Sequence, residues 1–481
     1  MKTKIASLKH IALLAAAAVA ASPAVSHAGV LRYFLHGGTE HVALGGVSLL
    51  DPGTSDLAIG QPALEVGRPQ TSLRMTYEYE DILRATENGA VTGDISARNA
   101  QRELVFTKSA PGRSVVLLAQ TQDVHTSTLD MKEPGYSGSR GNVEAYSVGM
   151  RFGNFAIGGG HTDNTSDTSG LSEFLRNDLF DSTRPPDFSA PADQPEKFLE
   201  AAAFPMKGVQ VFYKRVWGER NATLSMFGID TDTGAWSLSL PFTLDGGGRS
   251  AGFVAPVGRN LKLTFVDTKN HYGGRNSARL DYAAGVGSYD PFGLYTTIAK
   301  TESDGVELEW RRSDATRLLF GYQKSVFEGI YDGMFVSVPT GYYNVDAYVK
   351  MRPGMYHIGY EKEGAFQGVD FRTGLQYGEL NPEGYGMTVG ASCPFLVICN
   401  TTDTSARALP YTSITQRILT MGLSYKIGSV EAAYTIGQMV PKSTKRPDEN
   451  AAPSTGGTST AEPMKKAHGG TIHLFSLQYE F

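Results

Sequence analysis

The chain has 481 residues, a formal net charge of −5 and a mean hydropathy of −0.22. A mildly acidic chain is a poor partner for nucleic acid, because phosphate binding needs clustered basic residues. Beyond residue 28 no run approaches the ~20 apolar residues of a transmembrane helix, which excludes a helical membrane protein. The 55 glycines, 23 tyrosines and 23 phenylalanines instead suit a membrane β-barrel with aromatic girdles at its interfaces.

The amino terminus, residues 1–28, has the pattern of a secretory signal peptide. Three lysines at positions 2, 4 and 9 precede an apolar run from Ile11 to Ala21, and Ser26 and Ala28 supply the small residues of a cleavage site. The apolar run is too short to span a bilayer as a stable helix. Cleavage after Ala28 would remove three lysines and no acid, which takes the formal charge from −5 to −8.

The next segment, residues 29–70, contains apolar residues without long alternation. It includes the run from His41 to Gly53 and, further on, Gln61-Pro62-Ala63-Leu64. No strand is predicted here. The pattern leaves two interpretations open, namely a plug inside the barrel or a segment on the periplasmic side.

From Ser72 onward the chain is a series of segments in which apolar and polar residues alternate. The clearest lie at residues 72–80, 236–242, 261–265, 306–311, 343–349, 356–360, 369–377, 419–425 and 430–436. The strands of soluble sandwiches also alternate apolar and polar residues. The signal peptide and the alternating strand that ends the chain at Phe481 favour a membrane barrel instead. We predict an all-β fold, a single antiparallel transmembrane β-barrel over residues 71–481 with about 16–18 strands, within a range of roughly 14–22. Barrels of that size enclose an aqueous channel.

Three tight turns are predicted between these strands. Gly153-Asn154 and Gly428-Ser429 each separate two alternating runs, and Arg352-Pro353-Gly354 has turn composition as well. Since short turns of such barrels are periplasmic and long loops extracellular, these turns fix an orientation.

Two long loops are predicted on the extracellular side. Residues 161–207 hold nine acids and four basic residues, with helical spacing around Leu171 to Phe180 and a second short helix near Glu196 to Phe204. This acidic loop either constricts the lumen or caps the barrel from outside, and at the entrance it would favour cations. The second loop, residues 441–470, is polar and rich in Pro, Ser, Thr and Lys.

Charged residues on the polar faces of the strands are the candidates for lining the pore. Charges of both signs in a lumen select solutes by charge, although many could simply pair across strands and hold the wall together. The candidates are Arg74, Glu78, Lys262, Glu307, Glu309, Arg311, Asp346, Lys350, Glu361, Asp370 and Arg372.

The two cysteines, Cys393 and Cys399, are predicted to form a disulfide, since an exported chain meets an oxidising compartment. No residue is singled out for catalysis, for a cofactor or for a metal. The Gly248-to-Gly252 GxSxG match lacks the following helix of a nucleophile elbow, so we expect no enzyme.

The last strand alternates strictly from Phe475 and ends on the aromatic Phe481. This ending resembles the signature of Gram-negative outer-membrane β-barrels, which their assembly machinery reads, and the stretches Tyr146–Thr162 and Leu419–Thr435 resemble porin hairpins. The resemblance implies an outer-membrane location and contact with lipid and lipopolysaccharide, with a homotrimer as one expected assembly.

A second resemblance lies in the amino-terminal segment. Ala43-Leu-Gly-Gly-Val, Asp51 and Gln61-Pro-Ala-Leu64 are similar to the long-chain fatty acid transporter family, in which such elements form a plug inside a fourteen-stranded barrel. Here Gln61 replaces the usual Asn.

Three functions follow as expectations. The first is a porin-like channel for passive diffusion of small hydrophilic solutes. The alternatives are a channel for hydrophobic compounds that residues 29–70 plug, as the second resemblance implies, and a structural or adhesive barrel.

Overall fold

A computed structural model of the chain describes residues 42–44, 62–66, 71–87, 90–110, 113–130, 135–171, 187–230, 234–282, 292–337, 341–366, 368–395, 398–408, 412–445 and 467–481. The signal-peptide prediction therefore lies outside the described residues. Nearly all of the described chain is antiparallel β-structure. Within it, no helix is long and apolar enough to cross a membrane.

One short helix and eighteen strand segments make up the described chain. They are α4 (Pro62–Glu65), β1 (Ser72–Glu87), β2 (Ala90–Ala110), β3 (Arg113–Asp130), β4 (Gly135–Phe152), β5 (Phe155–Leu171), β6 (Asp187–Asp193), β7 (Glu196–Ala203), β8 (Gln210–Asp230), β9 (Gly234–Pro256), β10 (Leu261–Tyr282), β11 (Phe292–Ser313), β12 (Thr316–Ser337), β13 (Gly341–Phe366), β14 (Val369–Phe395), β15 (Ile398–Ala408), β16 (Thr412–Ile427), β17 (Val430–Lys445) and β18 (Ala467–Glu480).

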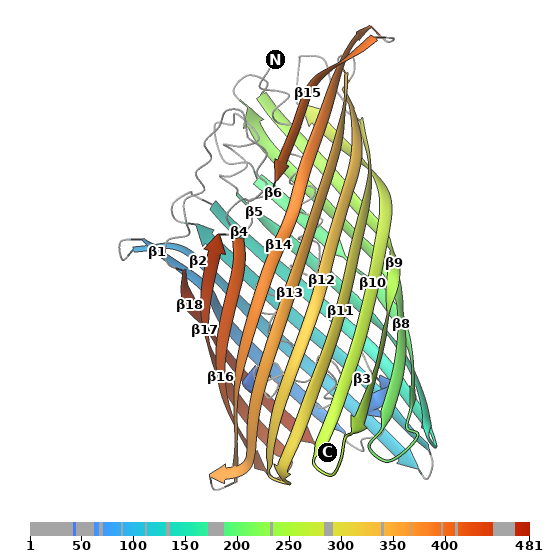
Figure 1. Cartoon of the computed structure of the whole chain (residues 1–481), viewed down its shortest axis with the longest axis vertical. Coiled ribbons are helices and arrows are strands. Elements are labelled where there is room, and N and C mark those ends of the chain that lie inside the picture. The colour runs from blue at the N-terminus through green and yellow to red at the C-terminus, as the bar shows by residue number, and fades with distance from the viewer. Residues whose placement is uncertain are drawn as a thin grey trace.

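The strands close into a barrel with sixteen wall positions (Figure 1). β6 and β7 share one position, because both lie between β5 and β8, one above the other. β15 pairs with residues 385–395 of β14, whereas residues 369–380 of β14 pair with β16. β15 therefore adds no wall position. The last strand pairs with the first from Ser72–Glu480 onward. This pairing abolishes the sheet edge and confirms the predicted closure.

The two faces of the wall have opposite character, which makes this a membrane-spanning barrel. On β18, Phe475, Leu477 and Tyr479 are exposed, whereas Ser476 and Gln478 are buried. A soluble sandwich would have the reverse arrangement, since its apolar face forms the core. We call the exposed apolar side chains nearest the short turns the apolar belt; Met75, Tyr77, Leu104, Phe106, Leu117, Met150, Val211, Tyr213, Leu375, Leu419 and Leu423 are among them.

Two of the three predicted turns are confirmed. Gly153 and Gly428 have φ of 59° and 60°, a left-handed conformation that favours glycine. The third prediction is wrong, because Arg352-Pro353-Gly354 lies inside β13. Pro353 lacks an N–H, and β12 pairs with β13 only on either side of it, at Lys324–Gly354 and Phe327–Met351.

The predicted acidic loop over residues 161–207 is shorter than expected. β5 continues to Leu171, and the predicted second helix is strand β7, where alternate burial of Phe198, Glu200 and Ala202 replaces helical spacing. Residues 172–186, with most of the first predicted helix, lie outside the described residues. Likewise β17 extends to Lys445 and β18 begins at Ala467, so residues 441–445 and 467–470 of the second predicted loop are strand.

Among the described strands of the wall, one position is broken, at Gln194-Pro195 between β6 and β7. The amide of Gln194 donates to the carbonyl of Asn164 at 2.9 Å, and the amide of Glu219 donates to the carbonyl of Pro195 at 3.2 Å. Proline cannot donate to a ladder, so the strand divides here while both pieces stay in the wall.

Candidate functional site in the barrel interior

The first described part of the amino-terminal segment, residues 42–44, binds the inner wall at β16. The Thr420 hydroxyl donates to the carbonyl of Ala43 at 2.9 Å, and Thr420 is fully buried. Leu44 packs with Leu319 of β12, and both are buried. Thr420 alternates with the exposed Leu419 and Met421. Residues 42–44 therefore lie inside the barrel.

The second described part, residues 62–66, binds β3 and β7. The amide of Ala63 donates to Glu200 Oε2 at 2.8 Å, and the Ser114 hydroxyl donates to the carbonyl of Val66 at 2.7 Å. Apolar packing adds to these bonds in two clusters of buried residues. These are Val66 with Val116, Leu118 and Ala145, and Ala63 and Leu64 with Ala156, Ala202, Phe204 and Phe212.

Glycines on the wall allow this close approach. A Cβ at Gly149 would lie 2.2 Å from the carbonyl oxygen of Pro62, and a Cβ at Gly422 would lie 2.5 Å from the Ala43 Cβ. Any other residue at these positions would push the segment away from the wall. Glycine is thus required here by contact with the segment.

The two parts lie on opposite arcs of the wall. Residues 62–66 contact β3, β4, β5 and β7, and residues 42–44 contact β12, β13 and β16. In the strand order these arcs lie about half a turn of the barrel apart. Figure 1 shows both parts in blue within the lower half of the barrel. The lumen is therefore occupied on both sides near the short turns.

An arc of aromatic side chains faces the interior on β7 to β10. Phe198, Phe212, Phe242 and Tyr272 are each buried. Cations lie over two of these rings: Lys214 Nζ is 4.2 Å from the Phe198 ring centre, and the Arg220 guanidinium is 3.8 Å from that of Tyr272.

Glu196, the first residue of β7, joins this arc to the strand break. It accepts a 2.6 Å hydrogen bond from the Tyr272 hydroxyl and pairs with Arg220 at 3.3 Å. The bonds tie β7, β8 and β10 together next to Pro195.

The predicted pore-lining charges mostly form ion pairs near the short turns. Glu309 pairs with Lys262 and Arg311, and Glu361 pairs with Arg317 and with Arg372, the latter at 2.6 Å. Arg74 donates to Gln478 Oε1 at 2.9 Å. Nine of the eleven candidates have inward register; they are Arg74, Glu78, Lys262, Glu307, Glu309, Arg311, Glu361, Asp370 and Arg372. Many of them hold the wall together.

The pore-lining prediction is wrong for Lys350. On β13 the buried residues are odd-numbered, from Pro353 to Glu361, and the exposed ones even-numbered, including Arg352 and Tyr356. Lys350 therefore faces outward. The sequence argument took Val345 and Val349 as lipid-facing, but this part of β13 lies beyond the apolar belt. The side chain of Asp346, in the same stretch, lies outside the described part of the chain.

Sequence reasoning missed the residues that bind the amino-terminal segment. Thr420 and Ser114 are ordinary polar positions of strands, and Glu200 falls in the stretch that was predicted as helix. Gly149 and Gly422 could have predicted these contacts. A glycine on the inward face of an alternating strand marks a place where another backbone approaches closely.

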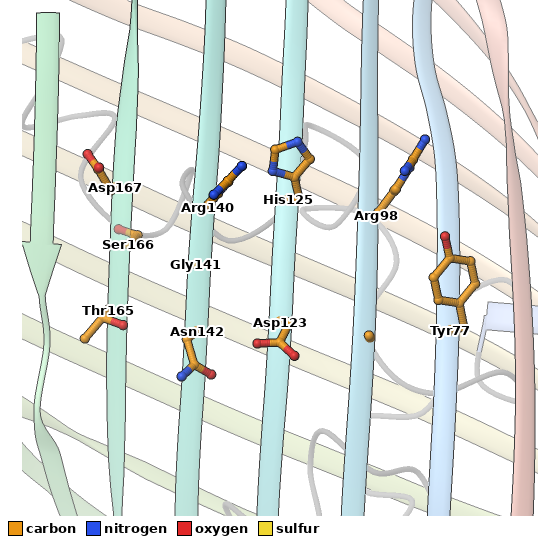
Figure 2. A pocket seen from close by; sticks show the side chains of 11 residues that line it. Tyr77, Arg98, Asp123, His125, Arg140, Gly141, Asn142, Thr165, Ser166 and Asp167 are labelled. Carbon is orange, nitrogen blue, oxygen red and sulfur yellow. The ribbon is translucent and has the colours of Figure 1, made fainter.

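Above the apolar belt, the outer surface carries polar side chains. A shallow cavity of about 690 Å³ lies on β1 to β5, and Figure 2 shows the side chains that line it. Its upper row runs across adjacent strands and consists, in order, of Arg98, His125, Arg140 and Asp167, each directly opposite the next. Tyr77, Asp123 and Asn142 belong to the lower row. This cavity belongs to the exterior, because Tyr77 is half exposed and its neighbours Thr76 and Glu78 are buried.

The cysteines lie on neighbouring strands of the β14–β15 hairpin, where Ser392 pairs with Asn400 and Phe395 with Ile398. Cys393 and Cys399 fall between these pairs. The disulfide stays a prediction.

Comparison with known proteins gives structural likeness only. No family model matches the chain, and no curated protein matches it. Similar solved structures include the Pseudomonas putida toluene transporter TodX, at 12% identity and a TM-score of 0.45, covering 93% of this chain and 99% of that one.

Two further structures are similar to the same extent. The Ralstonia pickettii toluene transporter TbuX has 11% identity and a TM-score of 0.42, covering 92% and 98% of the two chains. A Pseudomonas aeruginosa FadL homologue has 10% identity and a TM-score of 0.40, covering 93% and 99%. At these sequence identities and TM-scores the likeness carries no argument about function, so the proposed function rests on the chain's own geometry.

Proposed function

We propose that the protein is an outer-membrane channel for the uptake of small apolar compounds, and that residues 29–70 plug its lumen. The observation that carries the proposal is the binding of residues 42–44 and 62–66 to opposite arcs of the inner wall. A freely open porin has an unobstructed lumen, which an internal segment held by hydrogen bonds and apolar clusters does not fit.

The inner aromatic arc supports an apolar cargo. Binding sites for small apolar molecules are concave, lined by aromatic and aliphatic side chains, and contain few polar groups. Phe198, Phe212, Phe242 and Tyr272 provide an aromatic lining on one side of the barrel. Lys214 and Arg220, which lie over two of these rings, are its polar groups. Passive diffusion of hydrophilic solutes is the second candidate, because a barrel of sixteen strands is wide enough for water and its inner wall is charged.

Planar-bilayer recording and cellular uptake separate the two candidates. We expect the mature chain to show no steady ohmic conductance and a deletion of residues 29–70 to open stepwise conductance. Cells that express the full chain should take up radiolabelled toluene, the compound that TodX transports, faster than control cells, with no change in sucrose entry. Steady conductance of the full chain together with sucrose entry would instead establish passive diffusion.

A further inference from the structure

The outer wall carries three adjacent cations at the upper edge of the apolar belt. Arg215 of β8 lies directly opposite Arg249 of β9, which lies directly opposite Lys269 of β10. All three have the outward register of the exposed residues Tyr213, Phe253 and Phe265 on the same strands. We call Arg215, Arg249 and Lys269 the basic trio.

The trio is a costly arrangement without a ligand. Directly opposed residues on antiparallel strands have Cβ atoms about 5 Å apart, and like charges at that spacing repel. Lys269 has a partner, Glu302, at 3.8 Å. Arg215 and Arg249 form no ion pair with the described residues.

The neighbours of Arg215 carry no negative charge, whereas Arg249 has one acid, Asp267, diagonally across on β10. Arg215 lies opposite Leu199 on its other side. The outward rows below and above the two arginines hold Tyr213 with Ala251 and Trp217 with Gly247. Asp267 lies opposite Ala251, one outward row below Arg249, and lies opposite Asp304 of β11 on its other side. Arg215 therefore has no acid among its outward neighbours, and the two arginines share a single one.

The position of the trio identifies the kind of anion. Tyr213 is 47% exposed and Trp217 is 41% exposed, and such half-exposed aromatics are typical of the level where lipid headgroups begin. Because short turns face the periplasm, the upper edge of the belt lies in the outward-facing leaflet. Guanidinium groups bind phosphate with two parallel hydrogen bonds.

We propose that Arg215, Arg249 and Lys269 bind the phosphate groups of lipopolysaccharide. A phosphate between the two arginines would convert their repulsion into two attractive contacts, and the acyl chains of the same molecule would lie on the belt beneath. This site does not depend on what the channel carries.

The chain offers a matched control in the cavity of Figure 2. Arg98 and Arg140 lie on the same outer surface, but Asp167 lies opposite Arg140 and Asp123 lies in the row beneath. The double variant Arg98→Gln/Arg140→Gln removes the same charge from a compensated site.

Titration of the detergent-solubilised full chain with diphosphoryl lipid A, followed by native mass spectrometry, tests the proposal. We expect Arg215→Gln/Arg249→Gln to weaken binding about 30-fold, since each cation near an anionic lipid surface contributes roughly a factor of five. The control variant should stay within about threefold of the wild type. Dephosphorylated lipid A and inorganic phosphate alone should bind weakly.

Several outcomes would overturn the proposal. Unchanged binding by Arg215→Gln/Arg249→Gln, an equal loss in the control variant, or equally tight binding of inorganic phosphate would each do so. Thermal unfolding without lipid gives an independent check on folding. Relief of the repulsion should leave the midpoint of the Arg215→Gln/Arg249→Gln variant unchanged or higher, and a lower midpoint would show a structural role instead.

Discussion

At the residue scale, a few polar contacts determine where the amino-terminal segment lies. The carbonyls of Ala43 and Val66 and the amide of Ala63 each bond a side chain of the wall. Inside a low-dielectric wall an unmade bond at any of these places is costly.

Glu200 permits a test of this attachment with a matched pair of variants. Glu200→Ala removes the acceptor of the Ala63 amide, and we expect about 1–3 kcal/mol of lost attachment. Brief stepwise openings should then appear in planar-bilayer recordings. Glu200→Gln retains a carbonyl acceptor and should stay closed. Identical traces for the two variants would contradict this role of Glu200.

Gly149 tests the same attachment by crowding. Gly149→Val places side-chain atoms where the Pro62 carbonyl lies, so the segment must move and we expect ionic conductance to rise. Gly354→Ala is the control, because a Cβ there meets nothing within 4 Å. Swelling of proteoliposomes in an iso-osmotic sugar measures the difference; equal swelling of the two variants would be evidence against contact-driven closure.

At the element scale, ion pairs join strands near the short turns. Glu361 on β13 contacts Arg317 on β12 and Arg372 on β14, and Glu361 and Arg372 are buried. Lys426 and Glu480 at the rim pair at 2.5 Å but are 49% and 30% exposed. Removing one partner of a buried ion pair costs more stability than removing one partner of an exposed pair, because water screens only the exposed charges.

We therefore expect Glu361→Gln to destabilise the barrel by about 3 kcal/mol, since the buried Arg372 and the partly buried Arg317 both lose a carboxylate. Lys426→Gln should cost at most about 1 kcal/mol. Urea unfolding in lipid vesicles, followed by tryptophan fluorescence, measures both. Similar losses for the two variants would show that burial does not decide the strength of these pairs.

The elements also show how far the sequence could be interpreted. Strict alternation in the belt, as in residues 369–377 and 419–425, gave correct strands and correct faces, because lipid and lumen impose opposite polarity. Alternation failed for Lys350 and for residues 161–171, where β13 and β5 extend beyond the membrane and no solvent difference separates their faces. It failed for β7 because apolar residues lie on both of its faces, with Phe198 buried and Leu199 exposed. The attachment of residues 42–44 and 62–66 depends on hydrogen bonds between residues 48 to 377 positions apart in the sequence, which local patterns do not record.

At the scale of the whole molecule, the wall is much taller than the membrane. β14 has 27 residues, about 90 Å of extended chain, whereas spanning takes only about 9–11 residues of a tilted strand. The outward residues change from the apolar belt to charges such as Arg140, Arg249 and Arg417 partway up. The upper part of the barrel therefore stands in water.

This division predicts two zones of amide protection. In lipid nanodiscs, amides within the belt of β14 and β16 should exchange with deuterium slowest, and those of β14 beyond Glu379 should exchange faster, because lipid excludes water only from the first zone. Hydrogen exchange with mass spectrometry measures this. Uniform protection along β14 would show that the membrane covers the whole wall.

The break at Gln194-Pro195 has a mechanical consequence. Each other wall position is one continuous strand that carries load along its whole length, whereas the β6/β7 position consists of two pieces joined by a proline that cannot donate to either neighbour. When a force probe pulls the barrel from its carboxyl terminus, hairpins peel off in reverse chain order. Extraction should pause twice at this position, once for β7 and once for β6, where an unbroken strand gives a single event.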